Sequence, residues 1–310
     1  MSYPFFFDSR NSLNLFELQD KFKLLKDLYI KKALPKVLML TGEKGSGKST
    51  LVNHLLHSIF DENYNQKNNG IEGNSIFLKE YKKNIFSNII YIKGADFKSV
   101  KIEDIRNLKS KIFQSTILNK DRFIIFDDID LFNHNSLNAL LKTIEEPSKN
   151  TYFILINNKA KPLLETIKSR ALEIKIILNE NQRLKIINKL TSFYELELIL
   201  DPKTSKVSPG NFLKFNYLFK EYDISLNSDL CENISLLLNL YRKDKEILFI
   251  NLIFFIVDYY FTNLKNTNDF KNYEIHETKN YILNNINKFM LYNINQNALL
   301  NAISTKLKYE

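Results

Sequence analysis

The chain has 310 residues, of which 44% are hydrophobic and 25% are charged, the proportions of a soluble globular protein with room for two or three domains. Its net charge of +9 is compatible with a nucleic-acid partner, but the basic residues are spread along the chain, so a background composition rich in Lys and Asn explains the charge equally well. The single cysteine, Cys231, excludes an internal disulfide and a multi-cysteine metal site, and it fits a reducing cytoplasm.

Predicted strands and helices alternate over the first 180 residues or so. A helical pattern precedes Pro35, a polar loop covers 61–75, and helices are predicted at 102–112 and 136–146. Apolar runs predict strands near 37–41, 89–92, 123–126, 152–156 and 172–177. This alternation indicates an α/β fold with a parallel sheet covered on both faces.

After about residue 178 the sequence shows helical patterns in place of strands. The most apolar run, Ile247 to Val257, is too short to span a bilayer and predicts a buried helix. We expect no signal peptide and a cytoplasmic protein without a membrane partner.

A complete phosphate-binding pattern joins the first predicted strand to the helix that follows. It reads Gly42-Glu43-Lys44-Gly45-Ser46-Gly47-Lys48-Ser49. Such a turn leaves backbone N–H groups free to bind phosphates at the positive end of the helix dipole. The pattern predicts an ATP site in which Lys48 contacts the β- and γ-phosphates and Ser49 helps to hold Mg²⁺. The nucleotide-binding residues would be Gly42, Gly45, Gly47, Lys48, Ser49 and Thr50. The alternative is a turn whose glycines are incidental.

Acidic residues follow the predicted strand 123–126. Asp127 ends that strand, where a carboxylate would hold the water shell of Mg²⁺, although a helix cap or a solvated turn is the alternative. Asp128 stands where a catalytic glutamate is expected and is one methylene shorter. A displacement of about 1 Å can lower a rate roughly a hundredfold, so the site is expected to hydrolyse ATP slowly or not at all. Asp130 is expected to be a surface carboxylate.

Two further motifs follow the acidic residues. Residues 136–147 read Ser-Leu-Asn-Ala-Leu-Leu-Lys-Thr-Ile-Glu-Glu-Pro, and residues 166–170 read Thr-Ile-Lys-Ser-Arg. With the phosphate loop, they resemble in order and spacing the clamp-loader AAA+ ATPases, although Ala171 stands where the Ser-Arg-Cys motif of that family has cysteine. Within the family the chain is similar to the delta-prime type of bacterial DNA polymerase III subunit. That similarity continues more weakly through residues 207–210 and 293–300.

The resemblance implies a domain organisation and a set of roles. It implies a AAA+ module with a five-stranded parallel sheet at 1–177, a small helical lid at 178–222 and a helical collar at 223–310. Arg170 would act as an arginine finger toward a neighbour's nucleotide. Asn158, with Asn157 as the near alternative, would contact the γ-phosphate. The implied partners are the delta and gamma/tau subunits, the sliding clamp and primer-template DNA.

Three departures from the family pattern favour the delta-prime type over a motor subunit. Gly210 occupies the position where motor subunits carry a nucleotide-contacting arginine in the small domain. Residues 50–120 contain no cysteine, so the four-cysteine zinc module that often stands there is excluded and no zinc is expected. Asp128 replaces the usual glutamate.

Three alternatives remain open at this point. The first is a gamma/tau-type motor subunit of the same loader. The second is a self-contained P-loop ATPase, such as a kinase or a helicase-like enzyme. The third is a scaffold whose nucleotide pocket is vestigial.

Overall fold

The computed structural model describes residues 3–94, 121–266, 272–292 and 294–308. It divides into two compact units. One contains the residues up to Leu196 together with Lys206–Leu213, and the other contains Glu197–Ser205 and Lys214–Glu310. The domain boundaries near residues 177 and 222 stay a prediction.

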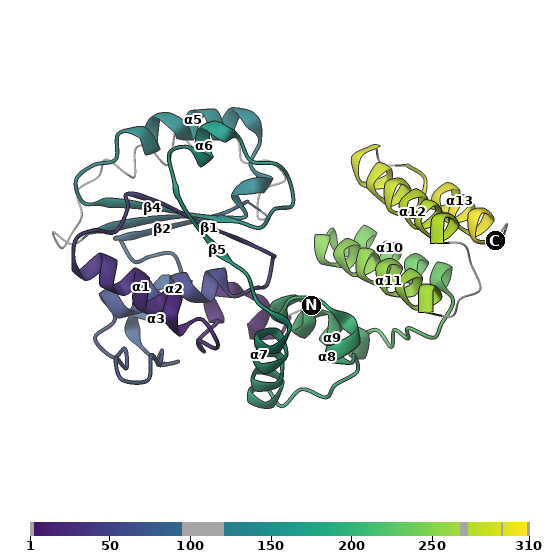
Figure 1. Ribbon diagram of the computed structural model, residues 1–310, viewed down its shortest axis with the longest axis horizontal. Helices are drawn as coiled ribbons and strands as arrows, with labels where there is room; N and C mark the ends of the chain where they lie inside the picture. Colours follow the sequence, from purple (N-terminus) through teal and green to yellow (C-terminus); the bar gives the residue numbers. More distant parts are fainter. Residues whose placement is uncertain (1–2, 95–120, 267–271, 293, 309–310) are drawn as a thin grey trace. The chain divides into compact units, whose positions relative to one another are not determined.

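A five-stranded parallel sheet forms the centre of the first unit (Figure 1). The strands lie in the order β2-β3-β4-β1-β5. Their bounds are Val37–Gly42 for β1, Ile89–Lys93 for β2, Arg122–Asp127 for β3, Thr151–Asn157 for β4 and Leu172–Ile176 for β5. All five predicted strands are present, and their ends differ from the predicted ones by one residue at most. The predicted α/β fold with a parallel sheet is therefore confirmed.

Helices cover both faces of the sheet (Figure 1). One face carries α1 (Gln19–Ile30), α2 (Lys48–Phe60) and α3 (Ile76–Lys82). The other face carries α5 (His134–Glu145), whose start is capped by Asn133, and the short α6 (Glu165–Lys168). The predicted helix 136–146 thus begins two residues earlier than expected, and the predicted helix 102–112 lies outside the described residues.

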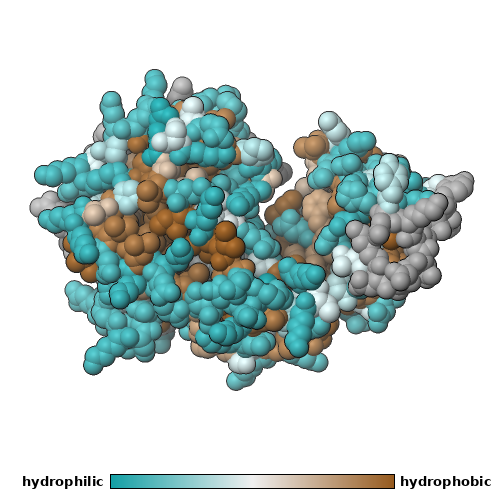
Figure 2. Space-filling view, viewed as in Figure 1, coloured by the Kyte–Doolittle hydropathy of each residue, from teal (hydrophilic) through white to brown (hydrophobic). Residues whose placement is uncertain are grey.

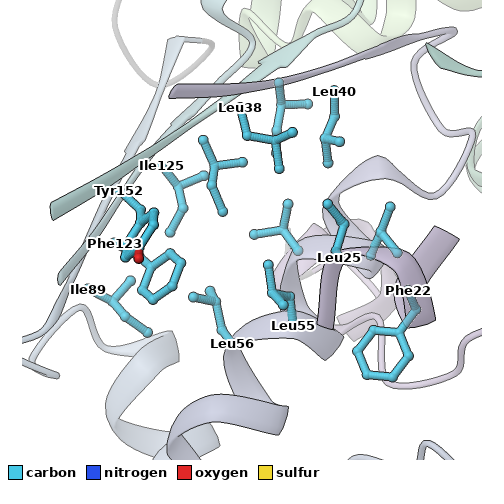
Figure 3. Close-up of a cluster of buried hydrophobic side chains, with 14 of the residues drawn as sticks. Phe22, Leu25, Leu38, Leu40, Leu55, Leu56, Ile89, Phe123, Ile125 and Tyr152 are labelled. Carbon is cyan, nitrogen blue, oxygen red and sulfur yellow. The ribbon is translucent and has the colours of Figure 1, made fainter. Parts of the chain in front are cut away.

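The alternation of side chains along β1 explains why the sheet needs helices on both faces. Leu38 and Leu40 pack with Leu55 and Leu56 of α2 in the first core cluster (Figure 3). Val37 and Met39, which point the other way, join a second cluster that includes Ile144 of α5. Because both sets are buried, a shift of one residue in the register of β1 would exchange its two faces.

The first unit also contains shorter elements at its N-terminus and a helix after β5. The N-terminal segment forms two 3-10 helices, η1 (Phe5–Phe7) and η2 (Ser9–Asn11), and η4 (Ile129–Leu131) follows β3. Helix α7 (Glu180–Phe193) starts with a capping box between Asn179 and Gln182.

The free edge of β5 is partly apolar. Leu172 is 51% exposed and Ile177, directly after the strand, is 76% exposed. Figure 2 shows apolar patches among hydrophilic side chains on the visible face of the sheet-bearing unit. An edge strand offers unpaired backbone groups to a further chain, so this edge is a surface on which a partner could add.

The second unit is helical. It contains α8 (Pro202–Ser205), α10 (Leu230–Asp244), α11 (Ile247–Asn266), α12 (Asn272–Tyr292) and α13 (Gln296–Lys308). Helix α9 (Pro209–Glu221) begins in the segment assigned to the first unit and continues in the second. Within this unit α11 packs against α10 and α12, and α13 packs against the same two helices.

Helix α11 is longer than the apolar run that predicted it. Among the described residues it is one helix that, by length and composition alone, could cross a membrane, with a mean hydropathy of 1.7 over Ile247–Leu264. The expectation that this run is too short to span was wrong, because Thr262, Asn263 and neighbouring residues extend the helix to 20 residues. Its inner face is nevertheless core, since Phe249, Leu252 and Ile253 are at most 1% exposed.

Candidate functional site

The phosphate-loop sequence forms a tight turn between β1 and α2. Strand β1 ends at Gly42 and α2 begins at Lys48. Gly45 and Gly47 have φ angles of 86° and 94°, in the left-handed region where a side chain is strained. Gly47 is the N-cap of α2, so the following backbone N–H groups open toward the turn at the positive end of the helix dipole. This geometry is a cradle suited to an anion.

Lys48 lies under this turn with its ammonium group turned inward. Its Nζ donates to the carbonyl oxygens of Gly42, at 2.9 Å, and Glu43, at 2.7 Å. Since an ammonium group has three donors, one remains for a ligand beside these two bonds. Burial lowers the pKa of Lys48 to about 8, although Asp127, Asp130 and Asp128 partly oppose the shift.

The carboxylate of Asp127 lies at the end of β3, next to the loop. It is 4% exposed and accepts a hydrogen bond from the hydroxyl of Tyr91 on the neighbouring strand β2. Burial, and after it the negative charge of Asp128, raises the pKa of Asp127. A buried carboxylate in this setting gains when a cation approaches, which suits the predicted Mg²⁺ role.

Asp130 differs from its prediction. It is 4% exposed, and its two carboxylate oxygens accept from the backbone N–H groups of Asn158, at 3.1 Å, and Ala160, at 2.7 Å. The prediction of a surface carboxylate was wrong, because the chain leaving β4 turns over β3 and needs acceptors for its amides. Asp130 thereby fixes the position of Asn158.

Three side chains form an ion-pair cluster that we call the Lys44 clasp: Lys44, Asp128 and Asn158. Oδ1 of Asp128 accepts from Nζ of Lys44 at 3.0 Å and from Nδ2 of Asn158 at 2.6 Å. The Asp128 side chain is 3% exposed and the Lys44 side chain 40%. Asp128 thus lies where a catalytic glutamate was expected, but its charge is already paired. Asn157, the alternative to Asn158, is buried, and its side chain accepts from the backbone N–H of Lys159.

Ser208 and the first residues of α9 lie against the phosphate loop within the first unit. Ser208 Oγ donates to the carbonyl of Lys44 at 2.5 Å, and Gly210 N donates to the carbonyl of Gly45 at 2.9 Å. A Cβ atom on Gly210 would lie 2.8 Å from Gly45 Cα, closer than such atoms come in proteins. Glycine at 210 is therefore required by the approach of two backbones, and the position has no room for an arginine.

Arg170 lies apart from this cluster, two residues after α6. One guanidinium nitrogen contacts Oε1 of Glu145 at 2.6 Å, and another donates to the carbonyl of Thr166 at 2.8 Å. The Arg170 and Glu145 side chains are 36% and 41% exposed. The guanidinium group is thus surface-accessible, and its partners among the described residues are exposed.

The structure brings together most of the predicted site residues and adds several that the sequence analysis missed. Lys48, Asp127, Asp128 and Asn158 meet at the carboxyl edge of the sheet, whereas Ser49 is half-buried and Thr50 pairs its hydroxyl with Ser12 at 2.6 Å. The missed residues are Tyr91, Lys44, Ser208 and Asp130. Lys44 stood inside the recognised loop and could have been found as a charge next to the nucleotide, but the others depend on strand order and on turns that the sequence does not show.

A parallel sheet in this strand order, with a phosphate loop after β1 and acidic residues after β3, defines a AAA+ P-loop module. The particular family follows from the sequence: the profile described as "DNA polymerase III, delta subunit" matches residues 18–179. The match covers just over half of the chain, so the chain belongs to this family of DNA polymerase III clamp-loader subunits.

Two curated relatives agree with this assignment by sequence. DNA polymerase III subunit gamma of Buchnera aphidicola subsp. Acyrthosiphon pisum is 30% identical over 154 residues, which are 48% of this chain and 40% of that protein. DNA polymerase III subunit delta' of Pseudomonas aeruginosa is 34% identical over 76 residues, which are 24% of this chain and 23% of that protein. A gamma subunit-related protein of Thermotoga maritima is 18% identical with a TM-score of 0.49, over 92% of this chain and 97% of that one. The chain spans less than half the length of the first two relatives.

Proposed function

We propose that this chain is a delta-prime-type subunit of a bacterial DNA polymerase III clamp loader, which helps to place the sliding clamp on primer-template DNA during replication. The contact between Gly210 and Gly45 carries the choice of subunit type. A motor subunit of the resembled kind needs an arginine at the position of Gly210, and the 2.8 Å approach to Gly45 Cα excludes any side chain there. The chain then acts in the cytoplasm, with the delta and gamma/tau subunits as partners and without a membrane.

The residues at the carboxyl edge of the sheet fit ATP with Mg²⁺. The left-handed glycines Gly45 and Gly47 supply the amide cradle, and the buried Lys48 supplies a cation with a free donor direction. Ser49 and Asp127 are the residues that would hold Mg²⁺, which neutralises phosphate charge when bound. Asp128 is one methylene shorter than the glutamate expected at its position, so we expect weak or no hydrolysis by this chain alone.

Arg170 is proposed to act on a neighbouring subunit. Its guanidinium group is bound to the exposed side chain of Glu145 and can leave that partner at little cost. A planar, permanently charged group can then stabilise the charge on a phosphoryl group that another subunit holds. The predicted lid at 178–222 and collar at 223–310 are proposed to join the chain to the other subunits, and no zinc is proposed.

Reconstitution tests this function. The full chain is mixed with the delta and gamma/tau subunits and the clamp of the same organism, and assembly and DNA-stimulated ATPase activity are measured. We expect a stable complex whose ATPase activity falls about a hundredfold or more with Arg170→Ala while assembly is unchanged. The proposal fails if the chain does not join the complex, and the finger role fails if Arg170→Ala leaves the activity of the assembled complex intact.

A gamma/tau-type motor is the second candidate, and a specific observation favours it. The phosphate loop is complete, and the Buchnera gamma subunit matches 48% of this chain, twice the share that the Pseudomonas delta' subunit matches. The two candidates differ in the activity of the chain on its own. Robust ATPase activity of the purified chain, lost in Lys48→Ala, would establish the motor and reject the delta-prime assignment. Activity without any partner and independent of Arg170 would instead indicate a self-contained ATPase.

A further inference from the structure

The phosphate loop carries two lysines in very different settings. The residue Lys48 is 3% exposed, and its ammonium group is bound to loop carbonyls. Lys44 lies four residues earlier in the same turn. Its side chain is 40% exposed, and its ammonium group contacts the carboxylate of Asp128. Its backbone is fixed by Ser208, so only the side chain is free to change partners. A lysine on a fixed backbone with a long, partly exposed stem can exchange one anion for another without movement of the fold.

The carboxylate that holds Lys44 is incompletely satisfied. Asp128 has a φ of 54°, which a non-glycine residue seldom adopts, and both of its donors bind the same oxygen, Oδ1. Within the described part of the chain, the other oxygen, Oδ2, is buried without a hydrogen-bond partner. A strained backbone and an unpaired buried oxygen are each found at functional sites, and here both occur in the carboxylate that pairs with a lysine of the phosphate loop.

We propose that Lys44 is a second phosphate-binding lysine, which Asp128 and Asn158 hold in the Lys44 clasp until the terminal phosphate of a nucleoside triphosphate takes it. The inference rests on the proposed nucleotide site and adds a selection between triphosphate and diphosphate. A terminal phosphate carries more charge than one carboxylate and draws the ammonium group from Asp128. A diphosphate lacks that group and leaves the clasp closed. Asn158 stays on Oδ1 in both states, because Asp130 fixes its backbone.

The clasp could instead be a purely structural ion pair, and the two roles predict different binding data. A structural pair affects the free energy of unfolding and leaves the ratio of triphosphate to diphosphate affinity unchanged. If the pair competes with phosphate, removal of Lys44 lowers that ratio and removal of Asp128 raises it. The effect of Asp128 then requires the presence of Lys44, which a double-mutant cycle measures.

The experiment titrates the full chain, with Mg²⁺, with fluorescent ADP and with a fluorescent non-hydrolysable ATP analogue. The variants are Lys44→Ala, Lys44→Gln, Asp128→Asn and the double variant Lys44→Ala/Asp128→Asn. Lys44→Gln keeps a donor for Asp128, so it serves if Lys44→Ala does not fold. Lys67→Ala is the charge control. Lys67 is exposed in the loop 61–75, and within the described residues its hydrogen bond is made by the backbone N–H, so this variant removes the same charge away from the site.

We expect Lys44→Ala and Lys44→Gln to lower the affinity for the ATP analogue about tenfold and the affinity for ADP less than about twofold. Asp128→Asn should raise the affinity for the ATP analogue about threefold or more, and the double variant should match Lys44→Ala. Equal losses for both nucleotides, or a gain from Asp128→Asn that persists without Lys44, would overturn the inference. Failure of the unaltered chain to bind either nucleotide would instead reject the nucleotide site of the proposed function, and this inference with it.

Discussion

The carboxyl edge of the sheet and the corner around Arg170 hold their charges in opposite ways. At the edge, Lys48, Asp127 and Asp128 are at most 4% exposed, and each has partners within the fold. At the corner, the pair of Arg170 and Glu145 is more than a third exposed on both sides. Burying charge is costly unless it is paired, so a fold keeps such a cluster where a ligand makes use of it. An exposed arginine costs little and is available to another molecule.

Under the proposed function, each region has a different kind of ligand. The buried edge is pre-arranged for a small anion that enters from solvent and binds to this chain. In the same proposal, the exposed corner contacts a group that another subunit presents. Substitutions at the edge should therefore change the properties of the isolated chain, whereas substitutions at the corner should change only those of the assembly.

Replacing Lys48 should have the largest effect on the isolated chain. Lys48→Ala removes the one buried cation whose ammonium group binds the loop carbonyls of Gly42 and Glu43. We expect the affinity for a fluorescent ATP analogue to fall about a hundredfold or more, since a charge-assisted contact to phosphate is lost in a buried setting. Lys67→Ala is the matched charge control. Retention of affinity within about threefold would show that the edge does not bind phosphate and would remove its contrast with the corner.

Adding one methyl group at Gly210 should destabilise the first unit. In Gly210→Ala the new Cβ would lie 2.8 Å from Gly45 Cα, so the start of α9 and the phosphate loop must separate. We expect the free energy of unfolding, measured in urea, to fall by about 1–3 kcal/mol. Gly73→Ala is the control, because its Cβ would meet Leu13 at an ordinary 3.7 Å. Equal stability of the two variants would mean that the start of α9 and the phosphate loop are not in tight contact.

The pH dependence of nucleotide binding tests how strongly the edge buries its cation. Burial lowers the pKa of Lys48 to about 8 from 10.5, so in the free chain the ammonium group loses its proton as the pH rises through 8. A bound phosphate favours the protonated form, so binding takes up a proton, and the affinity should fall about tenfold between pH 8 and pH 9.5. Between pH 8 and pH 9.5 the free energy of unfolding of the free chain should rise with pH. The reason is that Lys48 has a lower pKa in the folded state, so the unfolded chain binds more protons than the folded chain.

Calorimetry in two buffers of different ionisation enthalpy measures this proton uptake directly. At pH 8.5 the binding enthalpy should differ between the buffers in proportion to the protons taken up. An affinity and an enthalpy that are independent of pH and buffer would show that Lys48 keeps its ordinary pKa. The ammonium group would then be solvated, and the edge would resemble the corner.

Much of the edge could be predicted from the sequence because its signals are local. The five apolar runs predicted all five strands to within a residue, and the phosphate loop and Asp127 lie where the sequence placed them, next to strand ends. Apolar runs bounded by turn residues leave little freedom in where a buried strand lies. The helix at 247–257 was underestimated, because polar residues such as Asn263 continue it on the side away from the core.

The pairings within the edge could not be predicted, because they join residues far apart in the chain. Lys44 meets Asp128 only because β4 lies between β3 and β1 in the sheet, an order that no local pattern encodes. The burial of Asp130 depends on the path of the chain after β4, because Asp130 accepts hydrogen bonds from the backbone N–H groups of that segment. The contact of Gly210 with Gly45 likewise depends on the position of α9, which begins far along the chain from the phosphate loop.

The corner should give the smallest effect in the isolated chain. Arg170 is held by Glu145 and by the carbonyl of Thr166, and an exposed ion pair of this kind is worth about 0.2–1 kcal/mol. We expect Arg170→Ala to change the free energy of unfolding by less than about 0.5 kcal/mol and the nucleotide affinity by less than about twofold. A double-mutant cycle with Glu145→Ala should give a coupling energy that disappears at high salt, since solvent screens both charges. A larger coupling, resistant to salt, would show that Arg170 has a structural role within this chain, and a guanidinium group needed to hold α5 and α6 together could not also be free for a neighbouring subunit.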